Sequence, residues 1–224
     1  MPVTPSTQPS PAVAPVTEAE VIAAFARREH AGRALAGDVE RIARAAQAMA
    51  ARFHLGGKLI VFGDGGAGSD AAHVAVEFMH PVIVGKRALA AVALGNDATT
   101  TGRDGENGEG CGGGGGAAEV FAHQVRHWAD ASDMALGISR DDRCPSVPRG
   151  LRTARELGLL TIALTCGEAR GDGHGGEMAD HVLVAASDDP AVVKEVHVTA
   201  YHLLWELVHV FFDRLGPPAR GASR

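Results

Sequence analysis

Two residues that can move a proton or hold a metal stand four positions apart in the chain, His73 and Glu77. Residues at this spacing share one face of an α-helix, so an imidazole and a carboxylate there would project into the same space. Such a pair suits general acid–base chemistry, in which one group takes up a proton while another delivers one. It also suits metal binding, and a purely structural role stays open at this point.

A glycine-rich stretch comes directly before this pair. Asp64-Gly-Gly-Ala-Gly68 follows the apolar run 58–63 and precedes apolar residues at helical spacing, which predicts a buried strand, a tight turn and a helix. Because glycine has no side chain, the N–H groups of Gly65 and Gly66 can approach an anion at the positive end of that helix. The stretch therefore predicts a cradle for phosphate or a sugar phosphate beside the His–Glu pair.

A second set of ionisable residues lies near the end of the chain, on an otherwise apolar segment. Its members recur at steps of seven, four and three and so share a helix face: Glu195, His202, Glu206 and His209. The face is either functional or simply solvated. For His197 and His209, a hydrogen bond to a core carbonyl is the alternative to a functional role.

Strand and helix patterns alternate along the chain and must position these groups. Five apolar runs predict strands, over 58–63, 90–94, 133–138, 159–164 and 181–185. Helices are predicted between them and over 190–214. This alternation indicates an α/β fold class with a doubly wound five-stranded parallel sheet, whose ligands bind at the carboxyl ends of the strands. The turns after the first, third and fourth strands are expected to converge there.

An N-terminal helical pair is predicted ahead of the sheet. Thr17-Glu-Ala-Glu20 has the pattern of a capping box, so the first helix should begin there. A second, longer helix is predicted over 38–54, with an apolar stripe at the 3.6-residue period. The pair either covers the sheet or packs against a second subunit, and the pattern does not choose between them.

Composition predicts one folded domain with flexible ends. Residues 1–16 contain five prolines and are expected to form a disordered tail, 17–216 a single domain, and 217–224 a second tail. Residues 102–116 include nine glycines, which indicates a surface loop or a lid that becomes ordered on ligand binding.

Charge and cysteine content exclude several classes of protein. A net charge of −6 provides no basic surface for nucleic acid or an anionic membrane. The three cysteines, Cys111, Cys144 and Cys166, have no CxxC spacing, so neither a disulfide framework nor a zinc knuckle is indicated. We therefore expect a reducing, cytoplasmic location. The chain begins with prolines where a signal peptide would be basic and apolar.

Three motifs together resemble the sugar isomerase (SIS) family, over roughly residues 20 to 212. They are the segment 63–77, Gly137-Ile-Ser139 after the third strand, and Glu195-Val-His197-Val-Thr-Ala-Tyr-His202. Within that family the chain is similar to the phosphoheptose isomerases, which interconvert sedoheptulose 7-phosphate and an aldose heptose 7-phosphate through an enediol. The resemblance implies a flavodoxin-like sheet, with Glu77 as the general base and His202 as the acid.

The resemblance also implies a metal and an assembly. Some members bind zinc through positions that match His73, Glu77, Lys194 and His202, and the family forms homotetramers with shared active sites and an N-terminal helical bundle at the interface. Lys194 stands where the family has a glutamine, and a protonated ammonium cannot ligate a metal. Zinc binding therefore stays open.

The turn after the third strand departs from the family pattern. Where the family has Ser-Thr-Ser-Gly-Asn-Ser, this chain has Ser139-Arg-Asp-Asp-Arg-Cys144. The predicted substrate-binding residues are Gly65, Gly66, Ser69, Asp97, Ser139, Arg140 and Lys194. The departure favours two hypotheses: an isomerase that holds its phosphate differently, or a non-enzymatic sugar-phosphate-binding or assembly protein.

Overall fold

The computed structural model describes residues 15–95, 118–140, 144–167 and 178–215 of the 224-residue chain. The predicted tails and the glycine-rich segment 102–116 lie almost wholly outside these residues, and Asp97 lies outside them too. Those expectations stay predictions.

The centre of the fold is a five-stranded sheet in which every pairing is parallel. Its strand order is β2-β1-β3-β4-β5, which confirms the predicted α/β class. The strands are β1 (Leu59–Gly63), β2 (Ala91–Ala93), β3 (Met134–Ile138), β4 (Leu160–Cys166) and β5 (His181–Ala185).

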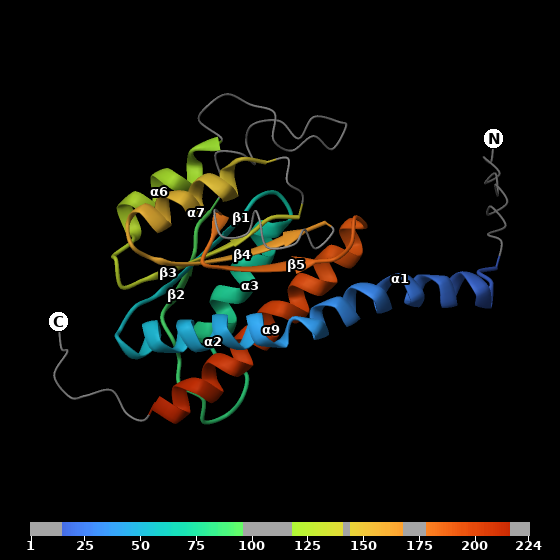
Figure 1. The fold of residues 1–224 in the computed structure, drawn as a ribbon, viewed down its shortest axis with the longest axis horizontal. Helices are drawn as coiled ribbons and strands as arrows, with labels where there is room; N and C mark the ends of the chain where they lie inside the picture. The colour runs from blue at the N-terminus through green and yellow to red at the C-terminus, as the bar shows by residue number, and fades with distance from the viewer. Residues whose placement is uncertain (1–14, 96–117, 141–143, 168–177, 216–224) are drawn as a thin grey trace, which may run out of the picture.

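Helices cover both faces of the sheet (Figure 1). One face is covered by α1 (Glu18–Gly37), α2 (Val39–His54), α3 (Ala67–Met79) and α9 (Pro190–Leu215), and the other by α6 (Val120–Trp128) and α7 (Ser146–Glu156). Alternate residues of β1 serve the two cores: Leu59 and Val61 face the first, Ile60 and Phe62 the second. This alternation buries every residue of β1.

The strand order places two turns next to each other at one edge of the sheet. β1 and β3 are neighbours, with Gly63 opposite Ile138. Their following helices, α3 and α7, lie on opposite faces, so the connections diverge between these two strands. In doubly wound sheets, ligands bind in the crevice at such a point. The fold thus brings the glycine-rich turn after β1 and the turn after β3 together.

The N-terminal helices agree only in part with the sequence prediction. The capping box of α1 is present, with Thr17 and Glu20 each bonding to the other's backbone N–H. The prediction that the second helix is the longer one is wrong, because α1 has 20 residues and α2 has 16. No proline interrupts α1, and it continues to Gly37. α2 packs on α9, whereas the N-terminal half of α1 projects from the body (Figure 1).

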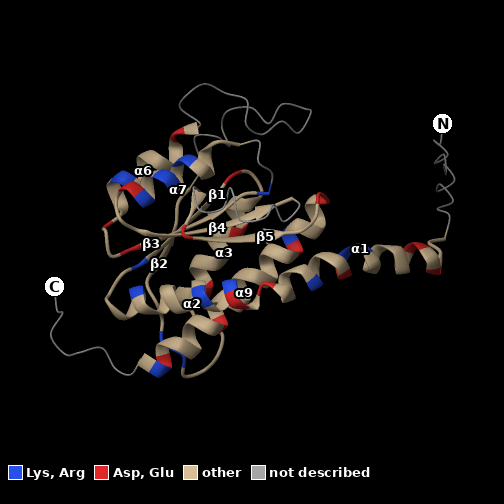
Figure 2. Cartoon of the chain, in the orientation of Figure 1, with Lys and Arg blue, Asp and Glu red and all other residues tan. Residues whose placement is uncertain are grey.

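Charges of both signs are interspersed along the helices (Figure 2). Several of them form surface ion pairs, such as Arg44 with Glu40 and Arg28 with Glu195. Among the described residues, no helix combines the length and apolar character that a membrane crossing requires.

Candidate active site

The glycine-rich turn starts α3 as the sequence predicts. Gly65 has a φ of +48°, in the left-handed region that favours glycine. The Ala67 N–H donates to the Asp64 carbonyl (2.8 Å) and the Gly68 N–H to the Gly65 carbonyl (3.1 Å). The Ser69 hydroxyl donates to the Gly66 carbonyl (2.8 Å), so its proton is used inside the helix. Since an anion accepts hydrogen bonds, the predicted role of Ser69 as its ligand requires the hydroxyl proton to turn from Gly66 to the anion.

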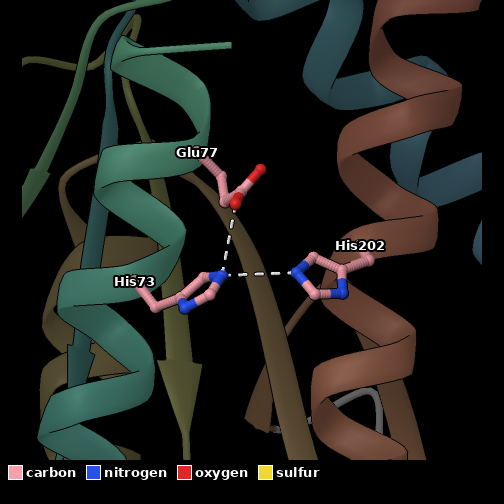
Figure 3. Close-up of side chains that lie close together, drawn as sticks. All are labelled: His73, Glu77 and His202. Carbon is pink, nitrogen blue, oxygen red and sulfur yellow. Dashed lines mark hydrogen bonds and ion pairs between the residues drawn. The ribbon is translucent and has the colours of Figure 1, made fainter. Parts of the chain in front are cut away.

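The side chains of His73, Glu77 and His202 meet between α3 and α9 (Figure 3). The His73 Nε2 lies 3.3 Å from Glu77 Oε1 and 3.3 Å from His202 Nε2. The side chain of His73 is 47% exposed and that of Glu77 17%. Three groups from segments 125 residues apart thus share one solvent-accessible cluster within a single subunit, as the proposed acid–base pair requires.

The two facing imidazole nitrogens of the cluster need a hydrogen atom or a cation between them. Two facing imidazole nitrogens at 3.3 Å cannot both offer lone pairs to each other, so one carries a proton or both bind a cation. With a proton between the two nitrogens, the cluster is a pair of imidazoles next to a carboxylate. Such a cluster can both accept and donate protons.

The same three side chains fit a zinc ion. Two histidines and a glutamate form a ligand set of catalytic zinc sites, which keep a fourth position open. Their ligand atoms all lie within 4.8 Å of one another. The 3.3 Å between the two imidazole nitrogens matches the separation of about 3.3 Å expected for two nitrogens about 2.0–2.1 Å from a tetrahedral zinc.

Lys194 makes a different contact from the glutamine it replaces. Its ammonium lies 2.6 Å from Oδ1 of Asp70, a residue of α3 whose side chain is 5% exposed. Asp70 is three residues before His73, so this ion pair lies about one helical turn from the cluster. Its other oxygen, Oδ2, is buried without a hydrogen-bond partner among the described residues. Sequence reasoning missed Asp70, although its position on the face of His73 was a signal.

Arg140 occupies the mouth of the glycine cradle. A Cβ atom at Gly66 would collide with the guanidinium of Arg140, so that group lies directly against the Gly66 backbone at the N-terminus of α3. Ser139, immediately before it, is buried, and its N–H donates to the Leu164 carbonyl (2.9 Å). The structure therefore brings Gly65, Gly66, Ser139 and Arg140 to one edge of the sheet.

Gly66→Ala is expected to displace Arg140 without unfolding the protein. The backbone of Gly66 is right-handed helical (φ −67°, ψ −13°), so alanine fits it, and only the end of a flexible side chain must move. We expect the free energy of unfolding to change by less than about 1 kcal/mol, while the KM for a phosphosugar rises. Urea unfolding and steady-state kinetics measure the two effects. A large loss of stability would show that the backbone cannot accept the methyl group.

The carboxylate of Asp64 bonds to the start of α7. Its Oδ2 accepts a hydrogen bond from the Ser146 hydroxyl (3.2 Å), at the first residue of α7. A carboxylate is favoured at a helix N-terminus, where N–H groups are unsatisfied and the helix dipole is positive. Asp64 thus stabilises the start of α7, a role that the sequence did not indicate.

Tyr201 packs against both histidines of the cluster. Its ring centroid lies 5.6 Å from that of His73 and 4.9 Å from that of His202, and the residue is only 3% exposed. Burial, with smaller contributions from Asp70 and Glu77, raises the pKa of Tyr201 to about 12. The phenol therefore stays protonated at neutral pH. Sequence reasoning did not select Tyr201, because an aromatic residue on an apolar helix usually belongs to the core.

The other conspicuous histidines of α9 are not part of the cluster. His197 is buried, and its Nε2 is 2.8 Å from the carbonyl of Thr165, which matches the core-carbonyl alternative. His209 is buried next to Trp205, and its Nε2 has no partner among the described residues. Glu195 pairs with Arg28 at the surface. Only His202 of the polar face thus reaches the candidate site.

Burial of His197 predicts a loss of stability in acid. Desolvation lowers its pKa from the ordinary 6.5, partly offset by the hydrogen bond to Thr165. Below pH 6.5 the unfolded chain therefore binds more protons than the folded one, and the free energy of unfolding falls as the pH falls. His197 contributes at most about 1.4 kcal/mol of this loss per pH unit. Urea unfolding of His197→Gln between pH 7.5 and 5 should show a shallower decline than the wild type, whereas the exposed His30→Gln should not.

Comparison with known proteins agrees with this fold. A family model described as a SIS domain matches residues 26–166. The phosphoheptose isomerase of Solidesulfovibrio magneticus is 34% identical over 203 residues, 88% of this chain and 94% of that protein. That of Bradyrhizobium sp. strain BTAi1 is 33% identical over 193 residues, 84% and 92% of the two chains.

A solved structure of a phosphoheptose isomerase also resembles this protein. The phosphoheptose isomerase from Neisseria gonorrhoeae superposes with a TM-score of 0.67 at 28% identity, covering 85% of this chain and 98% of that one. The two proteins share the α/β fold with its five-stranded parallel sheet. The chain belongs to the SIS domain family, and the two relatives described above, which it matches over most of their length, are phosphoheptose isomerases. The resemblance inferred from the motifs is confirmed.

Proposed function

We propose that this protein is an aldose–ketose isomerase acting on a sugar phosphate of the sedoheptulose 7-phosphate type. One observation carries the proposal: in a chain whose relatives are phosphoheptose isomerases, a carboxylate and two imidazoles converge beside a glycine cradle. Glu77 is the general base and His202 the acid.

The proposed reaction moves the carbonyl group by one carbon. Glu77 removes a proton from the carbon beside the carbonyl, while His202 gives a proton to the carbonyl oxygen, and the product of these two transfers is an enediol. The neighbouring hydroxyl then loses its proton to His202, and Glu77 returns a proton to the former carbonyl carbon. A zinc ion held by His73, Glu77 and His202 would supply Lewis-acid polarisation of a substrate oxygen in place of the proton from His202.

The anion of the substrate is held at the other end of the site. The N–H groups at the start of α3 and the Arg140 guanidinium provide positive potential there, and Arg140 replaces the hydroxyls of the family's third turn. Lys194 is paired with Asp70, whose position on α3 lies between the cradle and the cluster, and this supports its proposed contact with the middle of the sugar. The full proposed set is Gly65, Gly66, Ser69, Asp97, Ser139, Arg140 and Lys194.

The test is isomer interconversion by the purified protein in D₂O, followed by NMR. A working isomerase converts sedoheptulose 7-phosphate into an aldose and incorporates deuterium at the former carbonyl carbon, to which Glu77 returns the proton. Absence of both conversion and deuterium exchange, with a phosphoheptose isomerase relative active in the same assay, would reject the proposal.

A second candidate is a non-enzymatic SIS protein that binds a sugar phosphate or serves in assembly or regulation. The observation in its favour is that Lys194 pairs with Asp70 where relatives of this type place a glutamine ligand, which reduces the metal cluster to three groups. A thermal-shift screen with heptose, hexosamine and pentose phosphates separates the candidates. A rise in melting temperature without turnover supports a protein that only binds sugar phosphates. If none of the sugar phosphates raises the melting temperature, an assembly role is supported.

We also propose that the protein forms a homotetramer in the cytoplasm through its N-terminal helices. The projecting part of α1 exposes Val21, Ile22 and Phe25, and Phe25 is 71% exposed. A row of exposed apolar side chains on one helix is typical of an interface. Phe25→Glu is expected to shift the mass measured by light scattering to that of a smaller species. Leu157→Glu, an exposed site at the end of α7, is the control and should leave the mass unchanged.

A further inference from the structure

The last turn of α3 contains a carbonyl that its own helix cannot satisfy. In an α-helix, the carbonyl of Glu77 would accept a hydrogen bond from the N–H of residue 81. Residue 81 is proline, which has no N–H. A buried carbonyl without a partner is costly, so a donor from elsewhere is required.

Each carbonyl of this turn has a different donor. The Val76 carbonyl accepts from the His80 N–H (2.7 Å), and the Phe78 carbonyl accepts from the Leu89 N–H (2.9 Å). The Glu77 carbonyl accepts from the indole N–H of Trp205 on α9, at 2.8 Å. The backbone of the proposed base is therefore bonded to a side chain of the facing helix.

Trp205 is well placed to act as a fixed point. It is 7% exposed, and its ring packs against His209 with centroids 4.8 Å apart. It follows His202 by three residues, so both side chains lie on the same face of α9. The bond therefore joins the helix of the base to the helix of the acid within one turn of both groups.

We propose that Trp205 is a positioning residue that fixes Glu77 relative to His202 by donating its indole N–H to the Glu77 carbonyl. This inference rests on the proposed function, because positioning matters only if the two groups act on one substrate. A slip of one residue along a helix is 1.5 Å, and a 2.8 Å hydrogen bond does not survive it. Misplacement of about 1 Å can cost about 100-fold in rate.

Trp205→Phe tests the inference, because it keeps an aromatic ring and removes the N–H. The chain has one other tryptophan, Trp128, which is 63% exposed on α6, so Trp128→Phe is a matched control. We expect Trp205→Phe to lower kcat by about 10- to 100-fold with KM within about threefold, while Trp128→Phe keeps both. Amide hydrogen exchange in residues 76–80 should be faster in Trp205→Phe alone. Wild-type kcat and wild-type exchange in Trp205→Phe would overturn the proposal.

A second substitution separates positioning from local helix capping. Pro81→Ala restores an N–H two residues beyond the end of α3, so in the Trp205→Phe background it lets the helix extend and give the Glu77 carbonyl a donor without linking the helices. We expect kcat to stay low in this double variant. Recovery of wild-type kcat would show that the Glu77 carbonyl needs only some hydrogen-bond donor, not a link to α9, and would overturn the positioning role.

Failure of the proposed function gives a different pattern. If the wild type and Trp128→Phe both lack turnover, the isomerase assignment fails. The NMR signals of His73 and His202 and the amide exchange of residues 76–80 then test the contact by themselves. Changes in Trp205→Phe would support a fixed helix pair, and their absence would overturn it.

Discussion

Glu77→Gln is expected to lower kcat by about 10²- to 10⁴-fold, the usual contribution of a general base. Glutamine has nearly the same shape, so the helix and the contact with Trp205, which uses the backbone carbonyl, should be retained. What is lost is the group that accepts the carbon-bound proton. The measurement is the rate of isomerisation, together with deuterium incorporation from D₂O.

A matched control for this variant lies on the facing helix. Glu206 is exposed on α9, four residues after His202 and outside the cluster, so Glu206→Gln should keep wild-type kcat. Zinc content measured on both variants separates loss of the base from loss of a ligand. If Glu77→Gln isomerises as fast as the wild type, Glu77 is not the base.

Arg140→Ala is expected to raise the KM for a phosphosugar by about 10- to 100-fold with a smaller change in kcat. Hydrogen bonds to charged groups contribute about 1.5–3 kcal/mol, and Arg140 lies at the cradle, away from the reacting carbons in our proposal. Arg140→Lys should recover only part of the affinity, because an ammonium cannot make the paired contacts of a guanidinium. Arg152→Ala, at an exposed site on α7, is the control and should keep the wild-type KM.

Gly66→Ala and Arg140→Ala should not be additive. Both remove the guanidinium from the same place, so the double variant is expected to resemble Arg140→Ala alone. An additive rise in KM would mean that Gly66 and Arg140 contribute to binding separately. An unchanged KM in all three variants would place the anion somewhere else.

Much of the fold follows from local patterns in the sequence. Short apolar runs bounded by glycines predict the strands, because buried parallel strands are apolar on both faces. The turn 63–68 is also predicted locally, from its glycines. The His73–Glu77 pair is predicted because helix geometry alone puts residues four apart on one face. The length of α1 was mispredicted because its end depends on weak local signals.

The partners of the site residues were harder to predict. Lys194 was interpreted from its position in a motif, and its contact with Asp70 spans 124 residues. Asp64 was not selected as a site residue, and its carboxylate bonds to Ser146 at the start of α7. No local pattern encodes either contact, because each depends on how two elements pack.

The sequence by itself determined the parallel α/β sheet, its glycine-rich first turn and the placement of a carboxylate and an imidazole on one helix face, because these depend on the periodicity of neighbouring residues. Only the tertiary structure decided that His202 lies 3.3 Å from His73, that Arg140 lies on Gly66 and that Trp205 bonds to Glu77. Those contacts are set by the packing of α9 on α3 and of β3 beside β1. Side-chain hydrogen bonds form only after that packing has brought distant segments together.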